Sequence, residues 1–231
     1  MYLLLSDNVG TLLRKIDEGV EEVRAHYEAD LAAKQVSDEL LYAVSRIISD
    51  CLSALDWTAN AIKEKYGSSG GRSPYFPLRS TPQDFERGLD EQIRGLRATE
   101  PQIAHAFERH QPYQPGKTEL GYLHALGRVN KHQDFTPQIR QEQRRVDVQF
   151  SGGSVSFDPG AVRFGPGVSI GGVPVDPMTQ RPIPHPSQMV TEAVYVDWRF
   201  NDPPVSVLPT LEILATLVRV AVEDVRREAQ L

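Results

Sequence analysis

The 231-residue sequence lacks several features by which a protein class is usually recognised, and cysteine is the first. It holds one cysteine, Cys51, so no disulfide can form within the chain. Cys51 lies between Ile48 and Leu52, where a free thiol behaves as a small hydrophobic group. We therefore predict a protein of a reducing compartment.

Long apolar runs are also missing. The N-terminal run Met1–Leu5 follows no basic region and is too short for a signal peptide. No run approaches the ~20 apolar residues that a membrane-spanning helix needs. We expect no membrane segment and a cytoplasmic location.

An excess of basic residues is absent as well. The formal net charge is −6 and the isoelectric point is about 5.5, so the whole chain has no attraction for nucleic acid or an anionic membrane. The segment 128–145 is a local exception, with five basic and two acidic side chains. This segment either binds phosphate or balances the negative charge of the acidic helix predicted over 7–34.

Established catalytic motifs do not occur. The sequence has no GxxxxGK[ST], GxSxG, HExxH or CxxC. Two Gly-Gly pairs lie between predicted strands and suit turns. A metal site would have to combine His124 and His132 with the distant Asp56. We predict neither a metal nor a cofactor.

Helical periodicity dominates the first 145 residues. Apolar residues recur every three to four positions over 7–34, 37–66 and 82–109, which predicts three amphipathic helices. The strongest is 37–66, where Ser37 or Asp38 suits the N-cap and Gly67 the stop. Pro101 should break or restart the helix over 82–109, because the residue before a proline avoids helical geometry.

After Arg145 the period changes to two. Alternation of apolar and polar residues predicts strands near Val146–Phe150 and over Tyr195–Phe200. Gly171-Gly172 predicts a hairpin turn, and the prolines between 174 and 186 mark a long loop. A final amphipathic helix follows over 207–229.

This order predicts an α+β fold: a bundle of about four helices, a small antiparallel sheet and a closing C-terminal helix. Residues 1–145 would form the helical bundle. Residues 146–231 would form a strand-rich extension whose C-terminal helix packs back on the bundle, as one integrated domain.

The stretch 120–135 carries the most unusual polar residues. In a helix, His124, Arg128 and His132 share one face, at i, i+4 and i+8. Histidine can transfer a proton near neutral pH and arginine can bind a phosphate, which together suit RNA cleavage without a metal. The row is similar to that of the helical HEPN ribonucleases, although three residues between Arg128 and His132 fall just outside their usual spacing. The alternative is a polar helix face with ordinary structural hydrogen bonds.

A polar line crosses the otherwise apolar helix 37–66. Its members recur every three to four residues: Ser49, Ser53, Asp56 and Asn60. Such a line is either a solvent-facing strip or one side of a site.

Four short motifs in a fixed order resemble those of a family of uncharacterised bacterial proteins. They are SALD at 53–56, FP at 76–77, QPY at 111–113 and NKH at 130–132. The family has SALDH, FP, QPY and N-x-DKHR in the same order, and the resemblance covers about 40–132. It implies a shared architecture more than a shared chemistry.

Three departures separate this chain from the family pattern. Trp57 replaces the histidine after Asp56, Asn130 replaces the acidic residue before Lys131-His132, and Gln133 replaces the arginine that follows. If the family has an acid–base pair at these positions, this chain lacks it.

We therefore predict a binding or structural domain with an unidentified ligand. Its site would lie where Ser53, Asp56 and Asn60 meet Asn130, Lys131 and His132. Asp56 would pair with Lys131 or His132 as a polar clamp between helices. The alternative is a HEPN-like, metal-independent ribonuclease of stress or phage defence that uses Arg128, His132 and His124. RNA would be a partner only in that case; a second copy of the chain remains open, and we expect no membrane partner.

Overall fold

The computed structural model describes residues 2–67, 74–132 and 138–231. Within them, the side chains of 2–7, 128–132, 138, 140, 143–144 and 193–195 are outside the description. The chain divides into two compact units. Unit 1 comprises Met1–Ile139 with Trp198–Leu231, and unit 2 comprises Arg140–Asp197.

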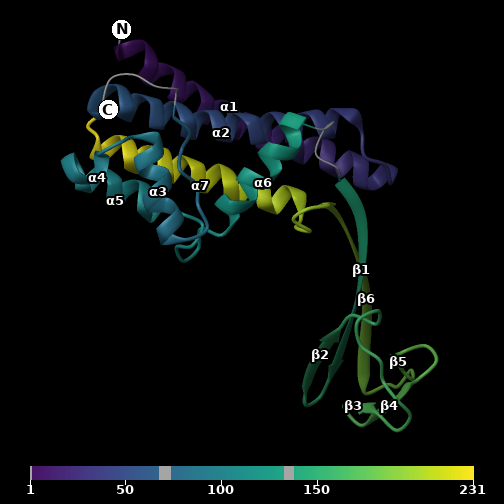
Figure 1. The fold of residues 1–231 in the computed structure, drawn as a ribbon. Coiled ribbons are helices and arrows are strands. Elements are labelled where there is room, and N and C mark those ends of the chain that lie inside the picture. The colour runs from purple at the N-terminus through teal and green to yellow at the C-terminus, as the bar shows by residue number, and fades with distance from the viewer. Residues whose placement is uncertain (1, 68–73, 133–137) are drawn as a thin grey trace. The chain divides into compact units, whose positions relative to one another are not determined.

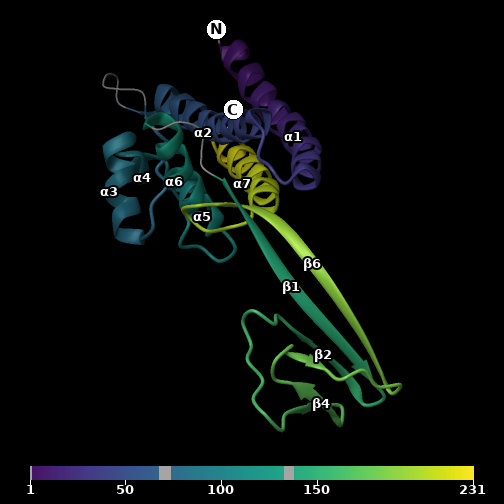
Figure 2. The ribbon, with the colours of Figure 1, turned by 90° about the vertical axis from the view of Figure 1, so that its right-hand side faces the viewer.

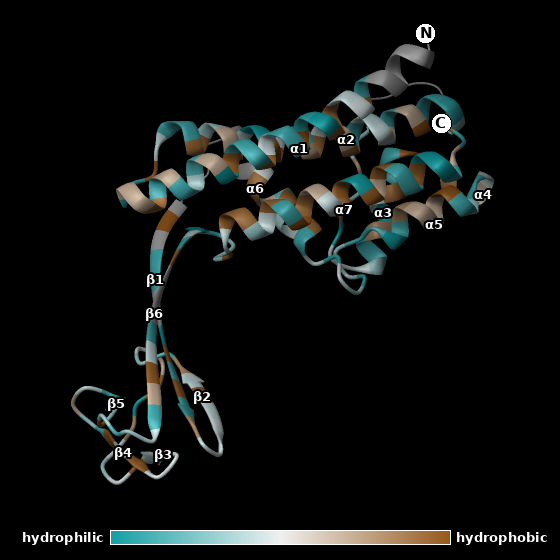
Figure 3. Ribbon diagram, turned by 180° about the vertical axis from the view of Figure 1, so that it is seen from behind, coloured by the Kyte–Doolittle hydropathy of each residue, from teal (hydrophilic) through white to brown (hydrophobic). Residues whose placement is uncertain are grey.

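Unit 1 is built around three long helices, α1 (Tyr2–Ala33), α2 (Asp38–Tyr66) and α7 (Val207–Glu228). These three helices pack against one another, and α6 (Glu119–His132) packs against α2 and α7 (Figure 1). Their hydrophobic residues gather on the sides that face each other, and the outer side of α1 is hydrophilic (Figure 3). None of the helices in the described ranges is long and apolar enough to cross a membrane.

Helix α2 forms as the sequence predicts. The hydroxyl of Ser37 accepts a hydrogen bond from the Leu40 amide at 3.2 Å, and the Gly67 amide closes the last turn on the Lys63 carbonyl. Its apolar stripe is buried almost completely and includes Val44, Ile48 and Leu55. A stripe this wide has neighbours on several sides, here α1, α6 and α7.

The mixed fold with a closing C-terminal helix is confirmed, whereas the bundle of about four helices is not. Seven helices occur among the described residues, because the segment predicted as one helix over 82–109 forms three. These are α3 (Pro82–Gln92), α4 (Leu96–Thr99) and α5 (Pro101–Arg109). Gly95, with a φ of +79°, lies between α3 and α4, directly before α4 begins. Pro101 starts α5, as predicted.

Unit 2 contains most of the strands, which form two small sheets. In the first, β1 (Gln138–Phe150) lies between β2 (Gly153–Phe157) and β6 (Gln188–Phe200). Figure 2 shows β1 and β6 side by side. In the second, β4 (Val173–Asp176) lies between β3 (Ser169–Ile170) and β5 (Arg181–Pro182). A small core of its own holds unit 2 together, formed by Val146, Val148, Phe157, Ile170 and Val175.

The hairpin at Gly171-Gly172 and the strand over Tyr195–Phe200 are both confirmed. Ile170 pairs with Val173, and the two glycines between them have φ of +55° and +83°, as a type I′ turn requires. The predicted loop between 174 and 186 is partly wrong, because it contains strand β5 and most of β4. Their prolines are tolerated because such short strands need few ladder hydrogen bonds.

The end of β6 belongs to the helical unit. Trp198 and Phe200 are buried in the core of unit 1. The Trp198 amide donates a hydrogen bond to the Tyr27 hydroxyl on α1, at 3.1 Å. The chain therefore re-enters the helical core before α7 begins.

Candidate functional site

An extended segment, Pro74–Arg79, lies against α2 and forms one wall of a pocket. Asp56 on α2 accepts a hydrogen bond from the Phe76 amide at 2.9 Å. One turn later, the side-chain amide of Asn60 donates to the backbone carbonyl of Asp56 at 2.9 Å and to that of Pro74 at 3.4 Å. A segment with no ladder or helix partners needs such side-chain bonds to satisfy its backbone.

The other end of this segment is held by Gln111, which follows α5. Its side-chain oxygen accepts from the Arg79 amide at 2.9 Å, and its nitrogen donates to the Phe107 carbonyl at 2.8 Å. The rings of Phe76 and Phe107 also pack together, with centroids 4.9 Å apart. The SALD, FP and QPY motifs thus meet around one segment, through Asp56, Phe76 and Gln111.

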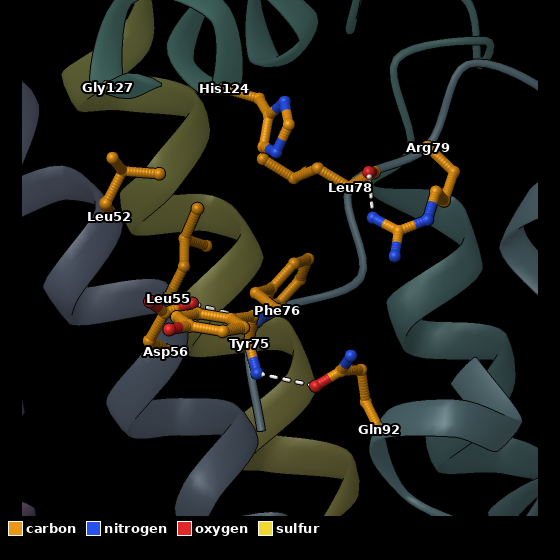
Figure 4. A pocket seen from close by; sticks show the side chains of 10 residues that line it. All are labelled: Leu52, Leu55, Asp56, Tyr75, Phe76, Leu78, Arg79, Gln92, His124 and Gly127. Carbon is orange, nitrogen blue, oxygen red and sulfur yellow. Dashed lines mark hydrogen bonds between the residues drawn. The ribbon is translucent and has the colours of Figure 1, made fainter. Parts of the chain in front are cut away.

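The pocket bounded by this segment has a volume of about 260 Å³ and is lined by α2, α3 and α6 as well (Figure 4). Its apolar lining comprises Leu52, Leu55, Phe76 and Leu78. Its polar lining comprises Asp56, Arg79, Gln92 and His124. Tyr75 and Gly127 complete it. All ten residues belong to unit 1.

Gly127 allows α6 to approach α2 closely at one edge of the pocket. A β-carbon at this position would lie 2.2 Å from the Cδ1 atom of Leu52, a distance that no real contact permits. The glycine therefore lets the Leu52 side chain occupy the space beside α6. It also explains why a helix interior holds a residue of such low helix propensity.

Two polar side chains on the pocket are fixed by neighbouring backbone. The Arg79 guanidinium donates to the Leu78 carbonyl at 2.8 Å and lies against Gly88 of α3, where a β-carbon would be 2.8 Å from its Nε atom. The Gln92 side-chain oxygen accepts from the Tyr75 amide at 2.9 Å. Because that oxygen is engaged, the Gln92 amide nitrogen faces away from Tyr75 and toward the side of the pocket that holds Arg79 (Figure 4).

The predicted site residues divide between described and undescribed side chains. Asp56, Asn60 and His124 are described: the first and third line the pocket and Asn60 holds its wall. Arg128, Asn130, Lys131 and His132 lie in the last turns of α6, but their side chains are outside the described residues. The row of His124, Arg128 and His132 and the clamp of Asp56 with Lys131 or His132 therefore stay predictions. Gln133 is outside the description altogether.

A second polar cluster, which the sequence analysis misses, joins α5 to α7. The Nε2 atom of His110 lies 2.8 Å from the Asp224 carboxylate. Arg109 donates to both oxygens of that carboxylate, from Nη2 at 3.2 Å and 3.0 Å, and Arg227 contacts it as well. The available signal was the position of Asp224, one turn from Ala221 on the apolar face of α7.

Burial and pairing shift the pKa values of this cluster. Burial lowers the pKa of His110 below its ordinary value and outweighs the opposite effect of Asp224. For Asp224, burial alone would raise the pKa, but the hydrogen bonds from His110 and Arg109 outweigh it and the pKa lies below its ordinary value. A neutral imidazole therefore faces an ionised carboxylate at neutral pH. The adjoining cleft of about 500 Å³ is lined by charges of both signs, among them Lys117 and Glu223.

Metal-ligating side chains do not gather in threes anywhere in the described ranges. Comparison with known proteins yields no match, whether to a family model, a curated protein or a solved structure.

Proposed function

We propose that unit 1 is a binding domain that takes a small, largely apolar molecule in the pocket between α2, α3, α6 and Pro74–Arg79. The observation that carries this proposal is the lining, in which apolar side chains form the walls and a few fixed polar groups converge on one cavity. Ligand pockets have this composition. A volume of about 260 Å³ suits a ligand of one or two rings.

The way the wall is held supports the same proposal. Asp56 and Gln111 accept hydrogen bonds from the backbone amides of Phe76 and Arg79, so these two amides are engaged away from the pocket. The pocket face of the segment then presents mainly the side chains of Phe76 and Leu78, which are both buried. A preformed apolar wall of this kind lowers the ordering cost of binding.

Binding of indole, an uncharged probe, tests the proposal. We expect chemical-shift changes at the amides of Phe76 and Gly127, with a Kd on the order of 1 mM or below. Leu78→Trp should fill the cavity and abolish these shifts. Ile213→Phe, at an exposed position on α7, is the matched control and should leave them intact. Absence of any shift at pocket residues, with indole and with toluene, would contradict the proposal.

The metal-independent ribonuclease is tested separately, because it depends on side chains outside the described residues. We expect purified protein to leave RNA intact in the presence of a chelator. RNA cleavage that disappears in Arg128→Ala at an unchanged melting temperature would instead assign the function to the row of His124, Arg128 and His132. If His132 belongs to the polar clamp, His132→Ala should lower the melting temperature, at a cost of about 1–3 kcal/mol.

A further inference from the structure

The pocket has a donor-rich end, formed by Gln92 and Arg79. Because the Gln92 oxygen accepts from the Tyr75 amide, both N–H groups of its side chain point the other way. Among the hydrogen bonds of the described residues, none uses these two donors. Gln92 therefore offers two donors to a ligand, while its oxygen is turned toward the Tyr75 amide.

Arg79 supplies charge at the same end. Its side chain is half-buried, and one of its five N–H donors is used by the Leu78 carbonyl. Within the described parts of the chain, no carboxylate lies within ion-pair distance of its guanidinium. This distinguishes it from Arg97 and Arg109, which each contact two carboxylates. A guanidinium with remaining donors suits bidentate binding of a carboxylate.

The opposite end of the pocket holds the Asp56 carboxylate, which would repel an anion. In Figure 4 the ring of Phe76 lies between Asp56 and the guanidinium of Arg79. One oxygen of Asp56 is engaged by the Phe76 amide. This polarity fixes an orientation, with the negative group of a ligand toward Arg79 and Gln92 and its apolar body against Leu55, Phe76 and Leu78.

We propose that the ligand is a small carboxylic acid with an apolar, ring-sized body, whose carboxylate is bound by Arg79 together with the Gln92 amide. This inference rests on the proposed function, because it assigns the ligand class of the same pocket. It requires no cofactor and no covalent step. His124, which lines the same pocket, is a neighbour of the bound acid.

Three probes of one shape test it: phenylacetate, phenylacetamide and phenethylamine, titrated into the full chain by NMR or calorimetry. We expect phenylacetate to bind at least about tenfold more tightly than phenylacetamide. Equal affinities of the acid and the amide would overturn the carboxylate inference and leave the proposed function standing. Binding of none of the three, nor of indole, would overturn both. Tighter binding of phenethylamine would show that Asp56 governs the site and would also overturn the inference.

Three variants separate the donors from the fold. Arg79→Met keeps the apolar stem and should remove the preference for phenylacetate while phenylacetamide binds as before. Gln92→Glu keeps an acceptor for the Tyr75 amide but replaces the donors by a negative charge, so it should weaken phenylacetate selectively. Arg94→Met, at an exposed position outside the pocket lining, matches the charge change and should have no effect.

Gly88→Ala gives a test that leaves every charge in place. The added methyl group would occupy the space beside the Arg79 Nε atom and displace the guanidinium. Because alanine is the better helix former within α3, folding should not suffer. We expect an unchanged or raised melting temperature and a loss of the preference for phenylacetate. A preference that persists in both Gly88→Ala and Arg79→Met would contradict the assignment.

Discussion

At the scale of single residues, Asp56 holds the wall of the pocket through the hydrogen bond from the Phe76 amide. Asp56→Ala should lower the free energy of unfolding by about 1–3 kcal/mol, because a partly buried amide loses its acceptor. Asp56→Asn keeps an acceptor oxygen and should cost less. Urea unfolding measures both, and hydrogen exchange at the Phe76 amide should accelerate in Asp56→Ala. Unchanged exchange would show that this bond does not hold the segment.

His110 makes stability depend on pH. Its pKa in the folded protein lies below the ordinary 6.5, so the unfolded chain binds a proton more readily. The free energy of unfolding should therefore fall as the pH drops below about 6.5. The lowered pKa of Asp224 acts in the same direction at more acidic pH, because its contribution is lost as the carboxylate is protonated.

Melting temperatures at pH 7.5 and 5.0 check this prediction. His110→Gln can still donate to Asp224 but does not titrate, so the difference between the two temperatures should shrink. His105→Gln, at an exposed position on α5, should leave the difference as it is. Equal differences in wild type and His110→Gln would contradict the assignment to His110.

The sequence predicts some site residues and misses others for identifiable reasons. Asp56 and Asn60 are found because they belong to a polar line that recurs at helical spacing opposite the apolar stripe of α2. Arg79 is missed because it lies in an aperiodic segment, where neither period gives a direction to the side chain. Gln92 is missed because its role depends on the Tyr75 amide, seventeen positions away in the chain.

At the scale of elements, the close packing of α2 and α6 depends on Gly127. Gly127→Ala should lower the free energy of unfolding, because the overlap of the new methyl group with Leu52 outweighs the gain in helix propensity. Adding Leu52→Ala should recover part of that loss, and a double-mutant cycle measures the coupling. Gly10→Ala is the control. A β-carbon there meets nothing within 4 Å, so helix propensity should raise stability by about 0.5–1 kcal/mol.

The spacing of apolar residues predicts some helices and strands and not others. Helices α2 and α7 follow from apolar stripes that the core buries, and the end of β6 follows from strict alternation. The start of β1 at Gln138 does not, because Gln138–Arg145 is almost entirely polar and shows no alternation. This part of β1 is a strand because it pairs within the β2-β1-β6 sheet. The spacing of apolar residues within a segment does not reveal its pairing partners.

At the scale of the whole molecule, each unit has a hydrophobic core of its own. Replacing Arg140–Asp197 by a short Asn-Gly turn should therefore leave unit 1 folded. We expect a helical circular dichroism spectrum and a melting temperature within about 4 °C of the intact chain, the shift that ~1 kcal/mol produces at this size. Loss of cooperative melting would show that unit 1 needs unit 2.

A core substitution, made in both the shortened and the intact chain, is the control for this experiment. Phe200 belongs to the core of unit 1 although it ends a strand, and it is completely buried. Phe200→Ala should cost about 3–5 kcal/mol in the shortened and intact chains alike. A much smaller cost in the shortened chain would mean that the end of β6 no longer packs among the helices.

The position of α7 also sets the order in which the core can be completed. This helix packs against α1 and α2, yet all of unit 2 separates it from them along the chain. On a ribosome, the part of the α2 stripe that α7 covers is therefore exposed while unit 2 is still being made. The short hairpins of β3, β4 and β5 can close first. Contacts between residues so far apart in the sequence slow folding, because the chain loses the entropy of loop closure before those contacts stabilise it. The helical half of the nascent chain is thus the part of this protein whose apolar surface waits longest for its final packing partner.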